Sequence, residues 1–252
     1  MGRSGVSVRR PVVAIIQARM GSQRLPRKVL KDIEGQTMLE RVVRRTQLAS
    51  IIDQIVVATT DRSDDEMVAV AAQNLGVHVT RGSEDDVLDR YRQAAIESGA
   101  ATIVRISADS PLVDPEVTDM VVDAFLTNDV DYASNKLEPS FPVGLDVEAF
   151  SLDALERTWR DAKEPYERSH VTVRMYSSPV ELRLMPVTTT PNLHHLRWTV
   201  DTREDLEFAR QVFKVFDGRN DFSWREVVEL IERQPAIASI NANVMAKAIE
   251  EG

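Results

Sequence analysis

Residues 12–28 read VVAIIQARMGSQRLPRK, and this stretch decides the expected fold. The apolar run at 12–16 is typical of a strand that is buried on both faces of a sheet. The segment that follows is polar and carries Gly21 and Pro26, so it predicts a loop at the carboxyl end of that strand.

Apolar runs and amphipathic segments alternate along the chain beyond this strand. Such alternation is typical of right-handed βαβ units, which build a mostly parallel sheet covered by helices on both faces. We therefore predict an α/β fold. The predicted strands are 54–59, 77–80, 101–107 and 130–134, and the predicted helices are 37–50, 63–75, 84–98 and 115–127.

The alternation breaks between residues 136 and 196, where six prolines fall. This segment is predicted to be an inserted lobe, with strands near 144–150 and 180–187 and helices near 152–162 and 166–176. Regular structure resumes with a strand at 197–202 and helices at 203–216, 224–234 and 242–250. We expect residues 1–10 to form a disordered tail and residues 11–252 to form a single domain.

Composition limits the class of protein. The chain has 252 residues, with 31 Lys and Arg against 40 Asp and Glu, so its formal charge is -9. A nucleic-acid-binding protein would carry a basic surface, so we expect no nucleic-acid partner.

The absence of cysteine excludes disulfides, thiolate zinc sites and cysteine nucleophiles. No apolar run approaches the roughly 20 residues of a membrane span and no signal peptide is recognisable, so we expect a cytoplasmic protein without a membrane partner.

The loop after the first strand carries a local excess of positive charge. Five cations lie within thirteen residues, namely Arg19, Arg24, Arg27, Lys28 and Lys31. Gly21 and Ser22 allow close backbone approach, and successive N–H groups in such a loop can bind an anion. Because ligands bind at the carboxyl ends of the strands in sheets of this class, the loop is predicted to hold a triphosphate. A solvated basic loop is the alternative.

Two aspartates follow other predicted strands. Asp109 comes after the strand at 101–107, and Asp201 lies near the end of the strand at 197–202. Magnesium in proteins binds one or two carboxylates together with water and phosphate oxygens, so this pair could hold Mg²⁺ against the phosphate loop. Taken singly, each aspartate could instead cap the helix that follows it.

Two further polar clusters could contact a substrate. Arg81 follows the predicted strand at 77–80 and lies where a base or ribose could be recognised. The acidic residues 84–86 could belong to the same site or to the first turn of a helix, which favours acidic side chains. His170 ends the polar stretch 165–170, for which a sugar site and an ordinary surface helix are both open.

These motifs resemble those of the cytidylyltransferase-like nucleotidyltransferases. Within them the chain is most similar to the branch of the spore-coat polysaccharide protein SpsF, which is related to CMP-Kdo and CMP-sialic acid synthetases. The resemblance runs from residue 12 to residue 216, most of the chain. It rests on several ordered motifs: QARMGSQRLPRKVL (17–30), VVATTD (56–61), RGSEDDVLDRY (81–91), SADSPLVDP (107–115), VDYASN (130–135), FPVGLDVEAF (141–150), PYERSHVT (165–172) and RWTVDTREDLE (197–207).

The resemblance implies a Rossmann-like, three-layer α/β/α nucleotide-diphospho-sugar transferase fold, with a lobe for acceptor binding and dimer contacts. It implies Mg²⁺-dependent transfer of CMP from CTP to a sugar acid, with release of pyrophosphate, for a surface polysaccharide or glycan. The implied partners are CTP, a small sugar-acid acceptor and a second copy of the chain in a homodimer.

The resemblance also implies roles for individual residues. Arg24, Lys28, Asp109 and Asp201 would be catalytic, and the two aspartates would bind Mg²⁺. The nucleotide would be contacted by Gln17, Ala18, Arg19, Gly21, Ser22, Arg24, Lys28, Arg81 and Ser107. The acceptor would be contacted by Asp146, Glu148, Arg168 and His170. The chain departs from the family pattern at Ala108, where the family usually has Gly, at Ser110, where this branch often has Cys, and at Ser169, where it often has an acidic residue.

Other functions stay open on the residues alone. The same chemistry could use another nucleotide, as in a uridylyl- or guanylyltransferase. A glycosyltransferase would be expected to carry a D-x-D pair, of which residues 109–111 supply only one aspartate. A non-catalytic nucleotide-binding protein is favoured by Ala108. The apolar positions Val171, Val173, Met175 and Leu182 could form a dimer face, although the core of the lobe explains them better.

Overall fold

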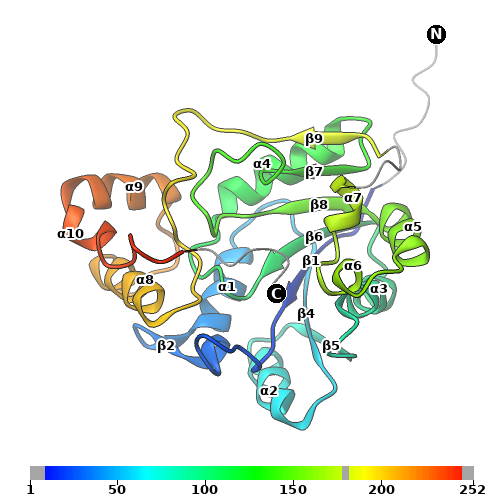
Figure 1. The fold of residues 1–252 in the computed structure, drawn as a ribbon, viewed down its shortest axis with the longest axis horizontal. Coiled ribbons are helices and arrows are strands. Elements are labelled where there is room, and N and C mark those ends of the chain that lie inside the picture. The colour runs from blue at the N-terminus through cyan, green and yellow to red at the C-terminus, as the bar shows by residue number, and fades with distance from the viewer. Residues whose placement is uncertain (1–8, 178–181, 246–252) are drawn as a thin grey trace.

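The computed structural model describes residues 9–177 and 182–245 of the chain. Its centre is a seven-stranded sheet made of β1 (Val12–Gln17), β4 (Gln54–Thr60), β5 (His78–Gly82), β6 (Thr102–Ser107), β7 (Tyr132–Ser134), β8 (Glu148–Ser151) and β9 (Leu184–Pro186). The strands lie side by side in the order β5-β4-β1-β6-β8-β7-β9 (Figure 1). Neighbours are parallel except at β8, which runs antiparallel to both β6 and β7. The predicted mostly parallel sheet is therefore confirmed.

The apolar run of β1 explains its central place in the sheet. Every residue of the run at 12–16 is completely buried. Val13 and Ile15 pack into one hydrophobic core, and Val12, Ala14 and Ile16 pack into a second core. Successive side chains of a strand point to opposite faces of its sheet, so a strand with a core on each face needs apolar residues throughout.

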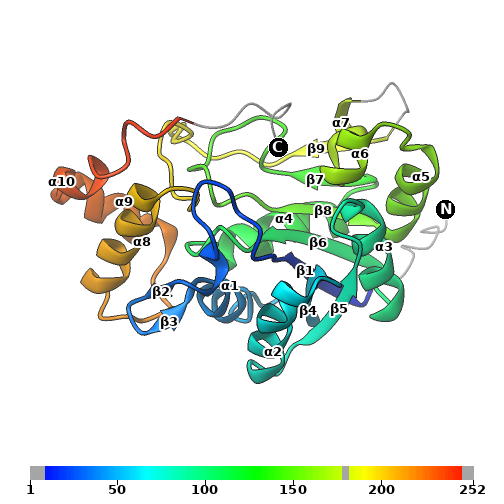
Figure 2. The same cartoon turned by 60° about the horizontal axis from the view of Figure 1, so that its bottom comes forward.

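Helices cover both faces of the sheet (Figure 2). They are α1 (Met38–Thr46), α2 (Glu66–Asn74), α3 (Val87–Glu97), α4 (Pro115–Thr127), α5 (Leu152–Asp161), α6 (Pro165–Ser169), α7 (Val173–Ser177), α8 (Arg203–Val215), α9 (Trp224–Arg233) and α10 (Pro235–Ala238). Tyr91 of α3 and Leu155 of α5 belong to the core on one face, whereas Val42 of α1 and Val121 of α4 belong to the core on the other. The three-layer α/β/α arrangement is confirmed. A hairpin of β2 (Asp32–Ile33) and β3 (Gln36–Thr37) and two 3₁₀ turns, Lys28–Leu30 and Ser63–Asp65, are the remaining described elements.

Acidic residues 84–86 do not form the first turn of a helix, as one interpretation of them required. α3 starts at Val87, because the Asp86 carboxylate caps it by accepting a hydrogen bond from a backbone N–H of the first turn. Glu84 lies before the helix, and its carboxylate is 3.4 Å from the Arg19 guanidinium.

The segment 136–196, which was predicted to be an inserted lobe, is joined to the body of the protein through the central sheet. It supplies β8 and β9 to the central sheet, and β8 lies between β6 and β7. The helix predicted at 166–176 is two short helices, α6 and α7, and Val171 between them has a φ of 54°. A right-handed helix cannot continue through a residue in this left-handed region.

The apolar positions considered for a dimer face belong to the core of the protomer. Val171, Val173 and Met175 are buried, and Leu182 packs against the same core cluster. Burial therefore supports the core interpretation for Val171, Val173 and Met175, whereas Leu182 is half-buried. The homodimer itself stays a prediction.

The segment 197–202 is extended but is not a strand of the sheet. In the described chain it forms one isolated bridge, between Arg197 and Val143. β6 is paired on both sides, by β1 and by β8, so it offers no free edge that this segment could join. The strand predicted at 197–202 is therefore wrong, because in the described chain this segment makes a single bridge and joins no sheet.

The two ends of the chain also differ from their predictions. Residues 1–8 of the predicted tail lie outside the described residues, whereas Arg9 donates a hydrogen bond of 2.6 Å to the Phe125 carbonyl oxygen. At the other end, no helix forms over 242–245, and residues 246–250 of the helix predicted there lie outside the described range. None of the helices in residues 9–177 and 182–245 is long and apolar enough to cross a membrane.

Candidate active site

A cavity of about 1080 Å³ opens beside the carboxyl ends of β1 and β6. Ligands bind at this edge in α/β proteins with parallel strands. Most residues that the sequence predicts for the site line it, namely Gln17, Ala18, Arg19, Gly21, Ser22, Arg24, Lys28, Ser107, Asp109, His170 and Asp201.

The basic loop after β1 is anchored by its apolar residues. Met20 and Leu25 are buried in the core, while polar residues around them line the cavity. The Met20 carbonyl oxygen accepts hydrogen bonds from the N–H groups of Ser22 and Arg27, at 2.9 and 3.2 Å, which closes the loop on itself. The Asp65 carboxylate accepts a hydrogen bond of 2.6 Å from the Met20 N–H. Contacts with the body of the protein therefore fix the loop.

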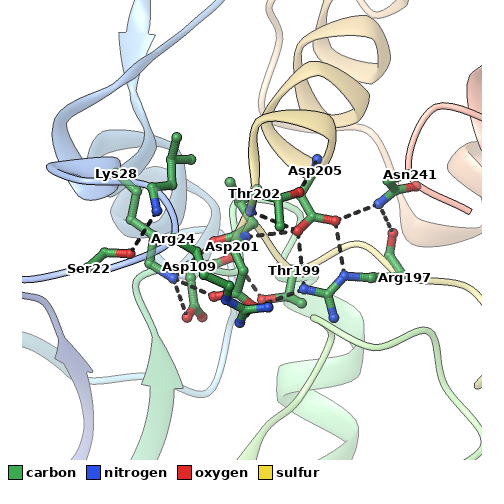
Figure 3. A network of polar contacts seen from close by, with 12 residues as sticks. Ser22, Arg24, Lys28, Asp109, Arg197, Thr199, Asp201, Thr202, Asp205 and Asn241 are labelled. Atoms are coloured by element: carbon green, nitrogen blue, oxygen red, sulfur yellow. Dashed lines mark hydrogen bonds and ion pairs between the residues drawn. The ribbon is translucent and has the colours of Figure 1, made fainter. Parts of the chain in front are cut away.

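Lys28 joins the two predicted aspartates (Figure 3). Its Nζ lies 2.9 Å from Asp109 Oδ2 and 2.8 Å from Asp201 Oδ1, and it donates a hydrogen bond of 3.0 Å to the Val200 carbonyl oxygen. Arg24 adds a second cation, with its Nη2 2.9 Å from Asp201 Oδ2. Residues that lie far apart in the sequence thus form one charged cluster at the edge of the cavity.

Asp201 reaches Asp109 because hydrogen bonds join their segments. The Asp109 carbonyl oxygen accepts hydrogen bonds from the Val200 N–H at 2.8 Å and from the Thr199 hydroxyl at 3.3 Å. The Val143 carbonyl oxygen accepts a further bond of 3.1 Å from the Thr199 N–H. The extended segment is therefore held by two loops and not by a strand.

Gly144 allows this close approach. Its φ is +107°, and a Cβ placed on it would lie 2.5 Å from the Thr199 nitrogen and 2.8 Å from the Trp198 carbonyl carbon. Both contacts are with backbone atoms, so no side-chain rotation relieves them. We expect Gly144→Ala to lower the free energy of unfolding by about 3 kcal/mol or more, because backbone strain and overlap add.

Gly35→Ala is the matched control for this prediction. Gly35 has a φ of +83°, but its added Cβ would meet nothing within 4 Å. Gly35→Ala should therefore lower the free energy of unfolding only by the cost of the left-handed backbone, about 1–2 kcal/mol. Urea unfolding of both variants measures the difference, and equal losses would show that the 144–199 contact is not tight.

Neither aspartate caps a helix, so the simpler interpretation of each is wrong. The cap of α4 is Asp114, which accepts hydrogen bonds from backbone N–H groups of its first turn. The cap of α8 is Thr202, which forms a reciprocal capping box with Asp205. The Asp109 and Asp201 carboxylates both face Lys28 instead.

A buried network that the sequence analysis missed holds Asp201 from behind (Figure 3). Arg197 Nη2 lies 2.8 Å from Asp201 Oδ2 and 3.1 Å from Asp205 Oδ2. Asp205 is completely buried and also accepts a hydrogen bond of 3.0 Å from the Asp201 N–H. Asn241 Nδ2 donates to Asp205 Oδ1 and to the Arg197 carbonyl oxygen, both at 2.9 Å. The T-x-x-D capping pattern at 202–205 was a visible signal for Asp205, whereas nothing near Asn241 in the sequence indicated its contact.

The charges of the cluster stabilise one another. Burial by itself would lower the pKa of Lys28, but Asp109 and Asp201 outweigh it and raise that pKa above its ordinary value. Burial would likewise raise the pKa of Asp109, but Lys28 outweighs it and lowers that pKa. Lys28 is therefore cationic and Asp109 anionic at neutral pH.

The aspartate pair fits a magnesium ion. Both carboxylates lie within 2.9 Å of one ammonium nitrogen, so they are close enough to share a single cation. Magnesium accepts one or two carboxylates and fills its other positions with water and phosphate oxygens. Among the described residues no group of three or more His, Cys, Asp or Glu side chains that could hold a metal occurs, so an ion bound here would have only these two carboxylates from the protein and would need water and phosphate oxygens to complete its shell.

Arg81 is not brought to the cavity. Its Nε donates a hydrogen bond of 3.0 Å to the Thr60 carbonyl oxygen, and its Nη2 donates one of 2.9 Å to the Arg62 carbonyl oxygen. Its Nη1 forms an ion pair with Glu66. These contacts tie the guanidinium to the loop after β4, and they do not support a contact with the base.

Of the four predicted acceptor residues, His170 lines the cavity and the other three do not. Arg168 points to Asp86, to which its Nε donates a hydrogen bond of 3.0 Å. Glu148 is 2% exposed and forms an ion pair with Arg105. A sequence shows that a residue is charged but not whether it faces a cavity or a buried partner, so Glu148 and Arg168 were assigned by motif alone.

Comparison with known proteins agrees with this fold. The model of the family described as cytidylyltransferase matches residues 13–234. An uncharacterized protein of Methanocaldococcus jannaschii is 37% identical over 95% of this chain and 98% of its own, and the spore coat polysaccharide biosynthesis protein SpsF of Bacillus subtilis is 31% identical over 90% of this chain and 97% of its own. The 3-deoxy-manno-octulosonate cytidylyltransferase of Geobacter sulfurreducens is 36% identical over 44% of each chain.

A solved structure resembles the whole chain. The cytidylyltransferase of Leptospira borgpetersenii serovar Hardjo-bovis superposes with a TM-score of 0.87 at 31% identity, over 94% of this chain and 99% of its own. On this likeness and on the family match, the chain belongs to the cytidylyltransferase family.

Proposed function

We propose that this chain transfers CMP from CTP to a hydroxyl of a sugar acid and releases pyrophosphate, as a step in the synthesis of a surface polysaccharide or other glycan. Family membership supports the nucleotidyl transfer. The relatives support the class of acceptor, because one is named for spore coat polysaccharide biosynthesis and another for a sugar acid, 3-deoxy-manno-octulosonate. The observation that carries the proposal is the meeting of Lys28, Asp109 and Asp201 at the cavity.

The reaction needs no protein nucleophile. The acceptor hydroxyl loses its proton to solvent, its oxygen bonds to the α-phosphorus, and the bond from that phosphorus to the oxygen of the departing pyrophosphate breaks. The protein then acts by positioning the reactants and by stabilising charge. Mg²⁺ held by Asp109 and Asp201 would neutralise the α-phosphate and lower the pKa of the acceptor hydroxyl. Arg24 and Lys28 would hold the departing pyrophosphate, since ion pairs with Asp201 fix both side chains at the cavity.

The balance of charge supports a divalent cation. Among the described residues that line the cavity, four are cationic (Arg19, Arg24, Lys28 and Arg105) and four are anionic (Glu84, Asp85, Asp109 and Asp201). A triphosphate would add several negative charges that this lining does not neutralise. A magnesium ion that enters with the nucleotide would reduce that excess, because it binds carboxylate and phosphate oxygens together.

The test is an assay of product. The purified protein is incubated with Mg²⁺, each of the four nucleoside triphosphates and a panel of sugar acids that includes 3-deoxy-manno-octulosonate and N-acetylneuraminate. We expect pyrophosphate release with CTP and at least one acid, and a CMP-sugar acid detected by mass spectrometry. Product with UTP or GTP alone would assign another nucleotide, and CTP binding without pyrophosphate release would favour a non-catalytic protein.

Asn241 is expected to affect catalysis through Asp201. We expect Asn241→Ala to lower kcat about tenfold and to leave the KM for CTP nearly unchanged, because Asp205 loses a partner and Asp201 its fixed orientation. Kinetics well below the melting temperature measure this, with Asn128→Ala as the control, since Asn128 is exposed at the end of α4. A lower melting temperature with an unchanged kcat would contradict this role.

A further inference from the structure

Arg105 is a charged residue in the middle of a buried strand. It lies on β6 two residues before Ser107, so both side chains point to the same face of the sheet. Its side chain is 19% exposed, and the residue lines the cavity. The Arg105 side chain is therefore mostly enclosed by the protein but is exposed to the cavity.

Glu148 holds Arg105 in place. The two residues are cross-strand partners in the antiparallel pair of β6 and β8, and they form an ion pair. Glu148 also accepts a hydrogen bond of 2.7 Å from the Tyr132 hydroxyl and another from the Thr172 hydroxyl, and its Oε1 lies 3.4 Å from Lys136 Nζ. An ionised carboxylate offers about four acceptor sites, so Glu148 has little capacity left. The Arg105 guanidinium donates to Glu148 through Nη1, while its Nε has no hydrogen-bond partner among the described residues, so this contact directs the group without using all of its donors.

Two cations lie against Glu148. Its carboxylate forms ion pairs with both Arg105 and Lys136. Asp146 is a further acidic group close to Lys136. Of these four residues Arg105 lines the cavity, so its guanidinium is the charge that an anion entering the cavity would meet.

The turn between α6 and α7 is also tied to Glu148. His170 lines the cavity, whereas Val171 is completely buried with a φ of 54°. A β-branched residue rarely adopts such a backbone, so the turn is held by its surroundings. Thr172 supplies one such contact through its hydrogen bond to Glu148, the partner of Arg105. One buried carboxylate therefore fixes two walls of the cavity relative to each other.

We propose that Arg105 binds the acid group of the acceptor and makes the enzyme selective for sugar acids over neutral sugars. The inference rests on the proposed function and adds the residue that recognises the negative charge of the acceptor. Arg105 lies about 7 Å along the strand before Ser107, deeper in the sheet than the aspartate pair. The planar guanidinium is suited to bind a carboxylate through two hydrogen bonds. The nucleotide phosphates are the other anions of the reaction, and the experiment separates the two.

The experiment compares each sugar acid of the panel with its own neutral carboxamide. Binding to the wild type is measured by calorimetry in the presence of Mg²⁺ and a CTP analogue with a non-hydrolysable α,β-bond. Turnover of the same acids is measured with CTP. The wild type should bind at least one acid more tightly than the amide of that acid. Arg105→Met should weaken the binding of that acid by about 10- to 100-fold, and it should leave the binding of the amide and the KM for CTP nearly unchanged. Arg105→Lys should restore part of the preference, because it keeps the charge but not the planar fork.

Two further variants keep the test decisive. The double variant Arg105→Met with Glu148→Gln removes the buried ion pair as a unit, so it guards against failure to fold. Arg92→Met is the matched control, since Arg92 also pairs with a glutamate, at 2.8 Å from Glu156, but does not line the cavity.

Equal binding of the acid by wild type and Arg105→Met, with turnover retained, would overturn this inference and leave the proposed function standing. A weaker KM for CTP with an intact acid preference would assign Arg105 to the phosphates instead. If the wild type binds and turns over no acid while it binds CTP, the sugar-acid acceptor and this inference both fall.

Discussion

Replacing Lys28 with methionine should lower kcat/KM for CTP by about 10²- to 10³-fold, the loss expected when one preorganised charge is removed from a site of charge stabilisation. Methionine keeps most of the length of the side chain and removes only the ammonium group. Hydrogen bonds to Asp109, Asp201 and the Val200 carbonyl oxygen hold that group at the edge of the cavity, where it can contact a phosphate. Steady-state pyrophosphate release with CTP and the acceptor measures the effect.

Lys31→Met is the control for Lys28. It removes the same charge three residues further along, and Lys31 does not line the cavity. The kcat/KM of Lys31→Met for CTP should stay within about threefold of the wild-type value, because a partly exposed charge is screened by solvent. Lys28→Met leaves two carboxylates without their shared cation, so the melting temperature of each variant is measured first. Wild-type activity in folded Lys28→Met, or an equal loss in Lys31→Met, would refute the assigned role.

Asp109→Asn and Asp201→Asn should each lower kcat by about 10²- to 10³-fold, because each removes a carboxylate from the pair that would hold the metal. The double variant should lose little more than either single one, since residues that act as a unit are not additive. Both single variants should also weaken the binding of Mn²⁺ in the presence of a non-hydrolysable CTP analogue, as followed by electron paramagnetic resonance. The asparagine side chain preserves shape, so these losses would reflect charge.

Asp61→Asn is the control for the aspartate pair. Asp61 follows β4 as Asp109 follows β6, but it is exposed and does not line the cavity. Its substitution should leave both kcat and Mn²⁺ binding unchanged. Undiminished Mn²⁺ binding in the Asp109 and Asp201 variants would mean that the metal binds elsewhere.

The fold could be predicted because its signals are local. The strands β1 and β4 contain apolar runs that need a core on both faces, and β1 is completely buried over its run at 12–16. Whether an extended segment joins the sheet is not a local property. The segment 197–202 has the pattern of a strand, but β6 already has two neighbours, so the segment is held by loop contacts at Val143 and Asp109 instead.

The candidate site could be predicted only in part, for a similar reason. Lys28 and Asp109 follow predicted strands, and the carboxyl ends of parallel strands meet at one edge of the sheet. Glu148 lies within a strand, where the sequence does not reveal that its partner is Arg105 on the neighbouring strand. Asn241 is 36 residues from Asp205 in the sequence but donates a hydrogen bond to it, and contacts between such distant positions depend on the folded structure.

A crystal structure of the protein with Mn²⁺ and a CTP analogue that cannot be cleaved between the α- and β-phosphates tests the central claim most directly. We expect an anomalous peak for the metal in contact with the Asp109 and Asp201 carboxylates, and phosphate oxygens within hydrogen-bond reach of Arg24 and Lys28. A metal bound by other residues, or a triphosphate that lies away from the loop at 17–28, would contradict it.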